Sequence, residues 1–264
     1  MDGSDARPKR RSDDFVQSLE RGLTVITVFG PDKSRLTLTE VATLSNLTRA
    51  TARRLLLTLE QLGYVGSEGS YYFLRPAVLQ LGYSYLSALS IADIAMIHLN
   101  PAADELHESC SASVLDGDSI VYIARASTTR IMSFTLSIGH RLPAISTSMG
   151  RVLLAALPQE ELERYLDSID YEPRTAMAIA TREDMQKEIE KVRQQSYSVV
   201  DQELEIGVRS VAVPVRDSRG TVIASVNASA HATRVDLETM HTRFLPRIQE
   251  VARAIEADLQ NIKS

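Results

Sequence analysis

Apolar residues recur with a helical period near the start of the chain. Three of them stand four positions apart, so they share one face of a helix that begins at Asp14: Phe15, Leu19 and Leu23. Gly30-Pro31 ends this pattern, because proline cannot continue a helix. The stretch Thr37-Leu38-Thr39-Glu40 has the Thr-x-x-Glu form of a capping box, and it predicts a short second helix from Leu38 to about Ser45.

A third helix and a hairpin follow. Thr48 can cap a helix from Arg49 to about Leu62 that Gly63 ends, and Ser45-Asn46 can supply the turn before it. Beyond Gly63 the pattern becomes β-prone, and two short runs around the turn 66–69 predict a hairpin: Tyr64-Val65 and 70–73. Helix, turn, helix and then hairpin is the layout of a winged helix-turn-helix.

Residues 76–90 predict a helix that links two domains. Arg75-Pro76 begins it, since proline is tolerated in the first turn. The segment is too apolar for an isolated linker, so we expect it to pack against a partner chain or the second domain.

The rest of the chain alternates helical and β-type patterns. A helix is predicted from Ile91 to about Ser109, bent or split at Pro101, and a hairpin is predicted around Asp116-Gly117-Asp118. The further predicted helices are 150–157, 160–167, 182–195 and 236–260; the predicted strands are 113–115, 120–125, 131–138, 198–200, 209–215 and 222–229. This order predicts an α+β domain with a mostly antiparallel sheet and helices on its sides.

Length and charge fit this division. We interpret the 264 residues as a flexible arm (1–13), a winged helix-turn-helix (14–75), a linker helix (76–90) and a second domain (91–264). Residues 1–90 carry 11 Lys and Arg against 9 Asp and Glu, whereas the remainder carries 18 against 25. Because DNA phosphates are neutralised locally, the overall net charge of −5 does not exclude DNA binding by the first third.

Other classes of protein are disfavoured. No apolar run approaches the roughly 20 residues of a membrane span, and the N-terminus lacks the apolar core of a secretory signal. Cys110 is the single cysteine, which excludes an internal disulfide and a cysteine-cluster zinc site. We therefore expect a cytoplasmic protein.

The third helix has two faces. Its predicted core positions are Ala52, Leu55, Leu56, Leu59 and Leu62. The predicted DNA-contacting positions are Thr48, Arg49, Ala50, Thr51, Arg53 and Arg54. Arginine can bond guanine bidentately, and threonine hydroxyls can reach phosphates or bases. The alternative is a helix with ordinary solvated arginines, which the capped preceding helix and the following hairpin disfavour.

A candidate anion site precedes the 150–157 helix. Its residues are Ser146, Thr147, Ser148, Met149 and Gly150. Free backbone N–H groups at a helix start, aided by hydroxyls, can bind a carboxylate. A plain Ser/Thr helix cap is the alternative from these residues alone.

Several long stretches together resemble the IclR family of transcription regulators, and within it the protocatechuate and β-ketoadipate pathway group. They are DDFVQSLERGLTVITVF, LTLTEVATLSNLTRATARRLLLTLEQLGYV, LHESCSASVLDGDSIVYIARAS, RLPAISTSMGRVLLAALP, YSVVDQELEIGVRSVAVPVRD and NASAHATRV. The resemblance covers the chain from Asp13 to its end.

The resemblance implies a winged-helix dimer joined by the linker helix to a GAF-like effector-binding domain, often as a dimer of dimers. It also implies control of aromatic-acid catabolism, with double-stranded operator DNA as one partner and a small aromatic or dicarboxylic acid as effector (protocatechuate, 4-hydroxybenzoate or β-ketoadipate). It favours the anion site at 146–150, and it adds Asp201, Asn227 and Ser229 as pocket positions. Arg130 is a further candidate for an acidic group, with a sheet-edge salt bridge as its alternative; Arg209 is equally ambiguous.

Two other functions remain to be weighed. For an enzyme, His107 and Cys110 stand three apart and could form a thiolate–imidazole pair, but the chain has no metalloprotease, nucleophile-elbow, P-loop or dinucleotide motif. We predict no catalytic residue, metal or cofactor. Alternatively, the second domain only oligomerises, or it senses a non-aromatic metabolite such as a small keto acid. Burying the polar cluster without a ligand or water would be costly, which disfavours pure oligomerisation.

Overall fold

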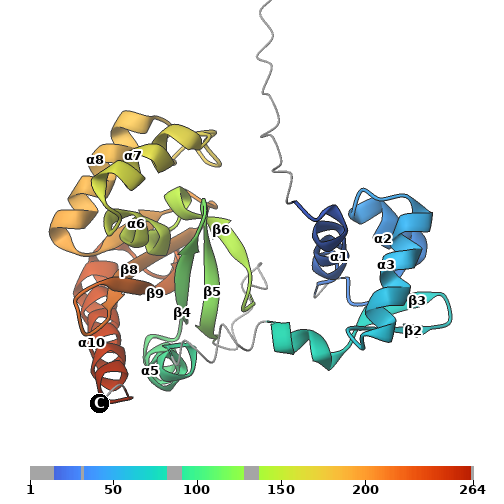
Figure 1. The fold of residues 1–264 in the computed structure, drawn as a ribbon. Helices are drawn as coiled ribbons and strands as arrows, with labels where there is room; N and C mark the ends of the chain where they lie inside the picture. The colour runs from blue at the N-terminus through green and yellow to red at the C-terminus, as the bar shows by residue number, and fades with distance from the viewer. Residues whose placement is uncertain (1–14, 31–32, 82–90, 128–136, 263–264) are drawn as a thin grey trace, which may run out of the picture. The chain divides into compact units, whose positions relative to one another are not determined.

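The computed structural model describes residues 15–30, 33–81, 91–127 and 137–262. The chain divides into two compact units, Met1–Tyr85 and Leu86–Ser264 (Figure 1). The expected flexible arm and most of the expected linker helix lie outside the described residues; the part described begins as a 3₁₀ turn, Pro76–Val78.

The first unit packs helices on a small sheet. Its elements are α1 (Gln17–Thr27), β1 (Leu36–Thr37), α2 (Leu38–Leu44), α3 (Arg49–Gln61), β2 (Val65–Glu68) and β3 (Tyr71–Leu74). The three strands pair antiparallel in the order β1-β3-β2. Val25 of α1, Val41 of α2 and Leu56 of α3 are fully buried together, so the helices share one apolar core.

Local chemistry fixes the ends of α2 and α3. The Thr37 hydroxyl accepts a hydrogen bond from the Glu40 N–H, and the Glu40 carboxylate accepts one from the Thr37 N–H at 2.7 Å, which confirms the predicted capping box. Asn46 adopts φ 52° between the helices, and Gly63 adopts φ 82° after α3. These left-handed residues reverse the chain where an ordinary side chain would be strained.

Two details of this unit differ from expectation. Leu62 was expected in the core but is 63% exposed, because α3 ends at Gln61 and Leu62 belongs to the turn into Gly63. The wing is a tighter hairpin than expected: residues 66–68 are part of β2, and the turn is confined to Gly69-Ser70.

The second unit is built on one sheet. Within its described part the strands are β4 (Ser109–Asp116), β5 (Ser119–Ala126), β6 (Arg141–Pro143), β7 (Ser198–Asp201), β8 (Val208–Arg216) and β9 (Val222–His231). All are antiparallel, in the order β6-β5-β4-β9-β8-β7.

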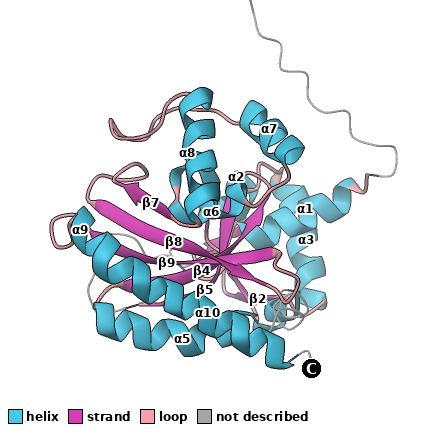
Figure 2. Ribbon diagram, turned by 90° about the vertical axis from the view of Figure 1, so that its left-hand side faces the viewer, coloured by secondary structure: helices cyan, strands magenta, loops and turns pink. Residues whose placement is uncertain are grey.

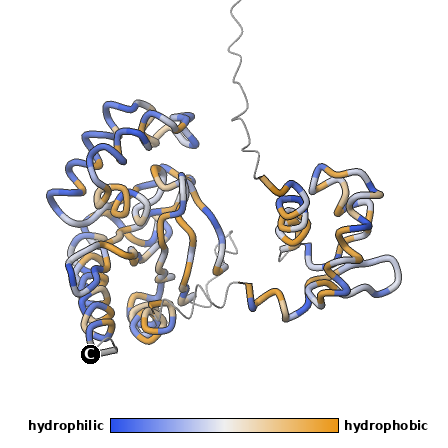
Figure 3. The backbone as a smooth tube through the Cα atoms, in the orientation of Figure 1, coloured by the Kyte–Doolittle hydropathy of each residue, from blue (hydrophilic) through white to orange (hydrophobic). Residues whose placement is uncertain are grey.

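Helices cover both faces of this sheet (Figure 2). One face carries α5 (Ile91–Leu106) and α10 (Leu245–Ile262) over a continuous apolar core. The other carries α6 (Ser148–Ala155), with α7 (Gln159–Ser168) and α8 (Arg182–Gln195) outside it. Figure 3 shows α7 and α8 as mostly hydrophilic, as expected of helices on the outside. No helix in the described ranges is long and apolar enough to cross a bilayer.

The second unit also departs from expectation in places. The predicted helix to Ser109 ends at Leu106, and β4 begins at Ser109. The predicted strand 131–138 lies almost wholly outside the described residues. The last helix is divided into α9 (Leu237–Thr239), a π-helical turn (Met240–Phe244) and α10.

Thr37→Ala should destabilise the first unit by about 0.5–2 kcal/mol, because it removes the hydroxyl that caps α2. Chemical denaturation followed by circular dichroism measures this loss. Thr43→Ala is the matched control, since its exposed hydroxyl bonds only back to the Thr39 carbonyl within the same helix. An equal effect of the two substitutions would show that the cap contributes nothing.

Candidate functional site

The start of α3 presents a basic, uncrowded surface. Arg49, Ala50, Arg53 and Arg54 are exposed on it, and the first turn carries no acidic residue. Thr48 caps the helix through the Thr51 N–H, and the two hydroxyls lie 2.9 Å apart. A helix N-terminus with cationic side chains and small neighbours is suited to binding a polyanion in a groove.

Side-chain contacts hold the wing against this helix. The Ser67 hydroxyl of β2 donates to Glu60 of α3 at 2.5 Å. Arg35 pairs with Glu68 at 2.6 Å and lies over the Phe73 ring, which fixes the hairpin to the segment before α2. The basic helix start and the hairpin therefore belong to the same compact unit.

The second unit contains a cavity of about 210 Å³ between the sheet and the start of α6. Its lining residues come from the six strands, the start of α6 and the segments between them: Ser109, Tyr122, Arg125, His140, Leu142, Ser146, Thr147, Ser148, Met149, Arg174, Val200, Leu204, Glu205, Val208, Ser210, Asn227 and Ser229. The volume is that of a small organic molecule, and the walls combine apolar side chains with a few polar groups.

Small polar residues form the floor of the cavity. Ser109, Ser229 and Ser210 stand opposite one another on β4, β9 and β8, because strand pairing places them in one row. In the next row Asn227 is 4% exposed, and its Nδ2 donates to the Ser229 hydroxyl at 3.0 Å. The Asn227 Oδ1 is buried and finds no donor among the described residues. Such an acceptor is costly to leave unpaired, so it is poised to receive a donor from a bound molecule.

A β-bulge brings two larger side chains to this face. The register of β4 and β5 shifts between Ala112 and Ser113, so Tyr122 and Arg125 both reach the cavity although they stand three apart. Burial raises the pKa of Tyr122 to about 12, which keeps its hydroxyl protonated at neutral pH.

The start of α6 forms the opposite wall. Thr147 caps the helix through the Gly150 N–H at 3.1 Å, and the Ser148 hydroxyl lies 2.8 Å from the Ser210 hydroxyl of the floor. A Cβ on Gly150 would lie 2.1 Å from the Ala144 carbonyl oxygen. Only glycine therefore allows α6 to pack this closely on the residues before it.

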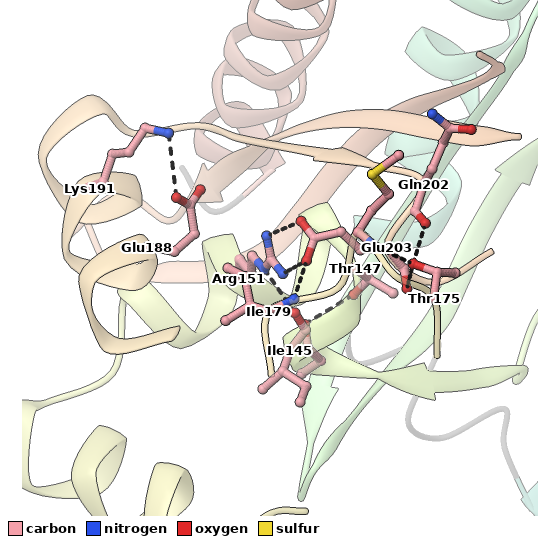
Figure 4. Close-up of polar contacts among 11 residues, drawn as sticks. Ile145, Thr147, Arg151, Thr175, Ile179, Glu188, Lys191, Gln202 and Glu203 are labelled. Atoms are coloured by element: carbon pink, nitrogen blue, oxygen red, sulfur yellow. Dashed lines mark hydrogen bonds and ion pairs between the residues drawn. The ribbon is translucent and has the colours of Figure 1, made fainter. Parts of the chain in front are cut away.

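A buried ion pair fixes this wall to the cavity rim (Figure 4). Arg151 of α6 bonds both oxygens of Glu203, at 2.8 and 2.5 Å, and its Nε donates to the Ile145 carbonyl. Glu203 also accepts from the Ile179 N–H, while Thr175 donates to the Gln202 carbonyl at 2.8 Å. The pair thus connects α6 with the two loops that carry Arg174, Leu204 and Glu205 to the cavity.

The structure brings together most of the predicted effector residues. The predicted residues that line the cavity are Ser146, Thr147, Ser148, Met149, Asn227 and Ser229. Gly150 does not line the cavity, because its backbone is packed on Ala144. Asp201 does not line the cavity either. Arg209 donates hydrogen bonds to both of its carboxylate oxygens, at 2.8 and 2.9 Å. Arg209 is therefore a structural partner of Asp201, and Arg130 lies outside the described residues.

Sequence reasoning missed Ser109, Tyr122, Arg125, Arg174 and Ser210. One signal for the floor was present: serines alternate with small apolar residues in Ser109-Cys110-Ser111-Ala112-Ser113. This period of two is typical of a strand with one polar face, but we assigned its first residue to the preceding helix. Nothing in the sequence marks the bulge that turns Arg125 into the cavity.

The environment of Cys110 bears on the predicted absence of thiol chemistry. Its side chain is fully buried, and burial raises the pKa of the thiol to about 12. The thiol therefore stays protonated at neutral pH, and His107 adopts φ 57° at the helix-to-strand turn. This geometry does not support a thiolate–imidazole pair.

Both units match profiles of one protein family. The profile described as IclR helix-turn-helix domain matches residues 18–69, and that described as Bacterial transcriptional regulator IclR C-terminal matches residues 83–257. These ranges contain α3 and the cavity, respectively.

Individual relatives agree with the profiles. The Pca regulon regulatory protein of Pseudomonas putida is 44% identical over 241 residues, covering 91% of this chain and 83% of that protein. A transcriptional regulator from Rhodococcus sp. RHA1 has a crystal structure with 48% identity and a TM-score of 0.83, covering 94% of this chain and 100% of that chain.

A third relative is similar to the second unit. It is the inducer-binding domain of the PobR transcription factor from Acinetobacter, crystallised as a double mutant in complex with 3-hydroxybenzoic acid. It is 28% identical with a TM-score of 0.59, and the match covers 63% of this chain and 97% of that chain.

Glu203→Leu should destabilise the second unit by about 3–5 kcal/mol, because it leaves the Arg151 guanidinium buried without a counter-charge. The double variant Arg151→Met/Glu203→Leu should recover most of that loss, since no buried charge remains.

Thermal and urea unfolding of the variants measure both effects. Lys191→Met is the control: it breaks the surface pair with Glu188 in the same view and should cost less than about 1 kcal/mol (Figure 4). A Glu203→Leu variant as stable as the control would refute a structural role for the buried pair.

Proposed function

The chain belongs to the IclR family of bacterial transcription regulators, and from this premise we propose that a small aromatic acid bound in the cavity controls its binding to operator DNA. The family consists of DNA-binding regulators and not of enzymes, which agrees with the function predicted from the sequence. The α+β fold, with a winged helix-turn-helix and an effector domain, is likewise confirmed.

The DNA contacts are assigned to the start of α3. In our proposal Arg49, Arg53 and Arg54 enter the major groove, Ala50 allows close approach, and Thr48 and Thr51 contact phosphates. Their exposure and the acid-free first turn support this assignment. A dimer, or a dimer of dimers, would place two such helices on two half-sites. Binding chromosomal DNA in a bacterium also puts the protein in the cytoplasm.

The effector assignment depends chiefly on one observation, the buried and unpaired Asn227 Oδ1 in the cavity floor. A ligand hydroxyl would satisfy it, and the apolar walls suit an aromatic ring. Thr147, Ser148, Met149 and Ser229 complete the proposed contacts. A domain that only oligomerises gives no reason for such a floor, and a small keto acid would leave much of the apolar wall without contact.

The class of controlled genes follows from the relatives. The Pca regulon regulatory protein is 44% identical, and the PobR domain was crystallised with a hydroxybenzoic acid. We therefore propose that the chain regulates aromatic-acid catabolism of the β-ketoadipate type. Effector binding would change operator affinity through a coupling free energy on the order of 1–3 kcal/mol.

Arg53→Ala should weaken operator binding roughly 5- to 150-fold, because a bidentate arginine–guanine contact contributes about 1–3 kcal/mol. Fluorescence anisotropy with a labelled operator measures this change. Arg253→Ala removes the same charge from an exposed position of α10 and should leave the affinity unchanged. Full operator affinity of Arg53→Ala would contradict the assignment of α3.

A hydroxylated aromatic acid should raise the melting temperature of the protein in a concentration-dependent way. At 100 times its Kd, a ligand that binds only the folded state stabilises it by about 2.7 kcal/mol. Asn227→Leu should reduce this shift strongly, since leucine fills the site but accepts no hydrogen bond. Scanning fluorimetry with protocatechuate, 4-hydroxybenzoate and β-ketoadipate provides the test.

Asn100→Leu, on the exposed side of α5, is the matched control for that substitution. An undiminished response of Asn227→Leu would remove the pocket assignment. A wild-type protein that responds to none of the acids would remove the effector class.

A further inference from the structure

One arginine of the second unit is half-buried beside the cavity without a carboxylate partner. Arg125 lies on β5; its Nε donates to the Ser127 hydroxyl at 3.0 Å and its Nη2 to the Ser109 hydroxyl at 3.3 Å. Among the described residues, no acidic side chain pairs with it. Both Arg125 and Ser109 line the cavity.

Other buried arginines of the unit show what this environment normally requires. Arg151 has Glu203 and Arg209 has Asp201, each as a two-pronged pair. Arg234, which is 37% exposed, likewise bonds both oxygens of the buried Glu108, at 2.7 and 3.0 Å. A guanidinium removed from water is stable when a planar carboxylate receives its parallel N–H groups. Serine hydroxyls supply no negative charge, so Arg125 lacks what the other three possess.

The surrounding charges leave this requirement unmet. Among the described residues that line the cavity, one is acidic. This residue is Glu205, which lies in the rim loop together with Leu204. Arg174 and His140 are also in the lining, and both are exposed. Burial lowers the pKa of Arg125, which is the effect expected of a cation desolvated without compensation. An anion entering the cavity would supply that compensation.

The start of α6 is less available to an anion. The Gly150 N–H is taken by the Thr147 hydroxyl, and the Ser148 hydroxyl is engaged with Ser210. These hydroxyls and the Gly150 N–H are therefore already engaged within the protein. At Arg125, by contrast, the guanidinium keeps donor capacity beyond its two serine contacts.

We propose that Arg125 binds the carboxylate of the effector, with Ser109 holding the guanidinium in place. The inference rests on the proposed function and deepens it: the ligand class is a planar organic acid whose carboxylate lies on β5 and whose hydroxyl is read by Asn227. Arg125 is then a binding residue whose charge is neutralised only in the complex.

Isothermal titration of the full-length protein tests this with two acid–amide pairs. The probes are 4-hydroxybenzoate with 4-hydroxybenzamide, and protocatechuate with 3,4-dihydroxybenzamide. Wild type should bind an acid roughly 10- to 100-fold more tightly than its amide. Arg125→Met should lose that preference by weakening acid binding alone, and Arg125→Lys should be intermediate because it keeps the charge but not the fork.

The unliganded variants provide a second, independent readout. Arg125→Met should melt no lower than wild type, since it removes an uncompensated buried charge. Arg253→Met, at an exposed position of α10, is the matched control and should bind the acids as wild type does.

Three results would count against the proposal. Wild-type acid affinity in Arg125→Met overturns it and leaves the proposed function intact. A clearly lowered melting temperature in that variant, with an unchanged acid-to-amide ratio, assigns Arg125 a structural role. Absence of acid binding by the wild type contradicts the proposed function itself, and this inference with it.

Discussion

The buried pair between Arg151 and Glu203 is the interaction on which the arrangement of the candidate pocket depends. Arg151 is 1% exposed in the second turn of α6, and Glu203 accepts from it and from the backbone of a second loop. One side wall and both rim loops are therefore fixed to one another by charge and hydrogen bonds. Such a pair adds little net stability compared with an apolar replacement, whereas removing one partner leaves a costly buried charge. Here the pair joins the start of α6 to the loops at the cavity rim.

The two faces of the sheet differ: one contributes mainly to stability, and the other also forms the candidate binding site. Its face toward α5 and α10 carries a continuous apolar core, whereas the face toward α6 combines a second apolar cluster with serines, an unpaired asparagine oxygen and a half-buried arginine. Small hydroxyls leave space that larger apolar residues would fill. The unpaired groups cost free energy in the unliganded protein, and a ligand that satisfies them recovers it as binding energy.

Local chemistry made much of the fold predictable. The Thr37–Glu40 capping box, the Thr48 cap and Gly63 each determine a helix end on their own, and α8 was predicted with the bounds it has. The cavity was less predictable, because it depends on long-range features. The shift at Ala112/Ser113 decides that Arg125 faces the cavity, and the pairing of Asp201 with Arg209 removes a residue that the resemblance had placed there. Leu62 shows the same limit on a smaller scale, because a helical pattern in the sequence can continue beyond the residue at which the helix ends.

The most direct test of this account is a crystal structure of the protein with protocatechuate or 4-hydroxybenzoate. The account predicts the acid between the serine-rich floor and the start of α6, its carboxylate on the Arg125 guanidinium and a hydroxyl donating to the Asn227 Oδ1. An acid bound elsewhere, or one whose carboxylate lies on the start of α6 with Arg125 still bonded only to serines, would contradict it.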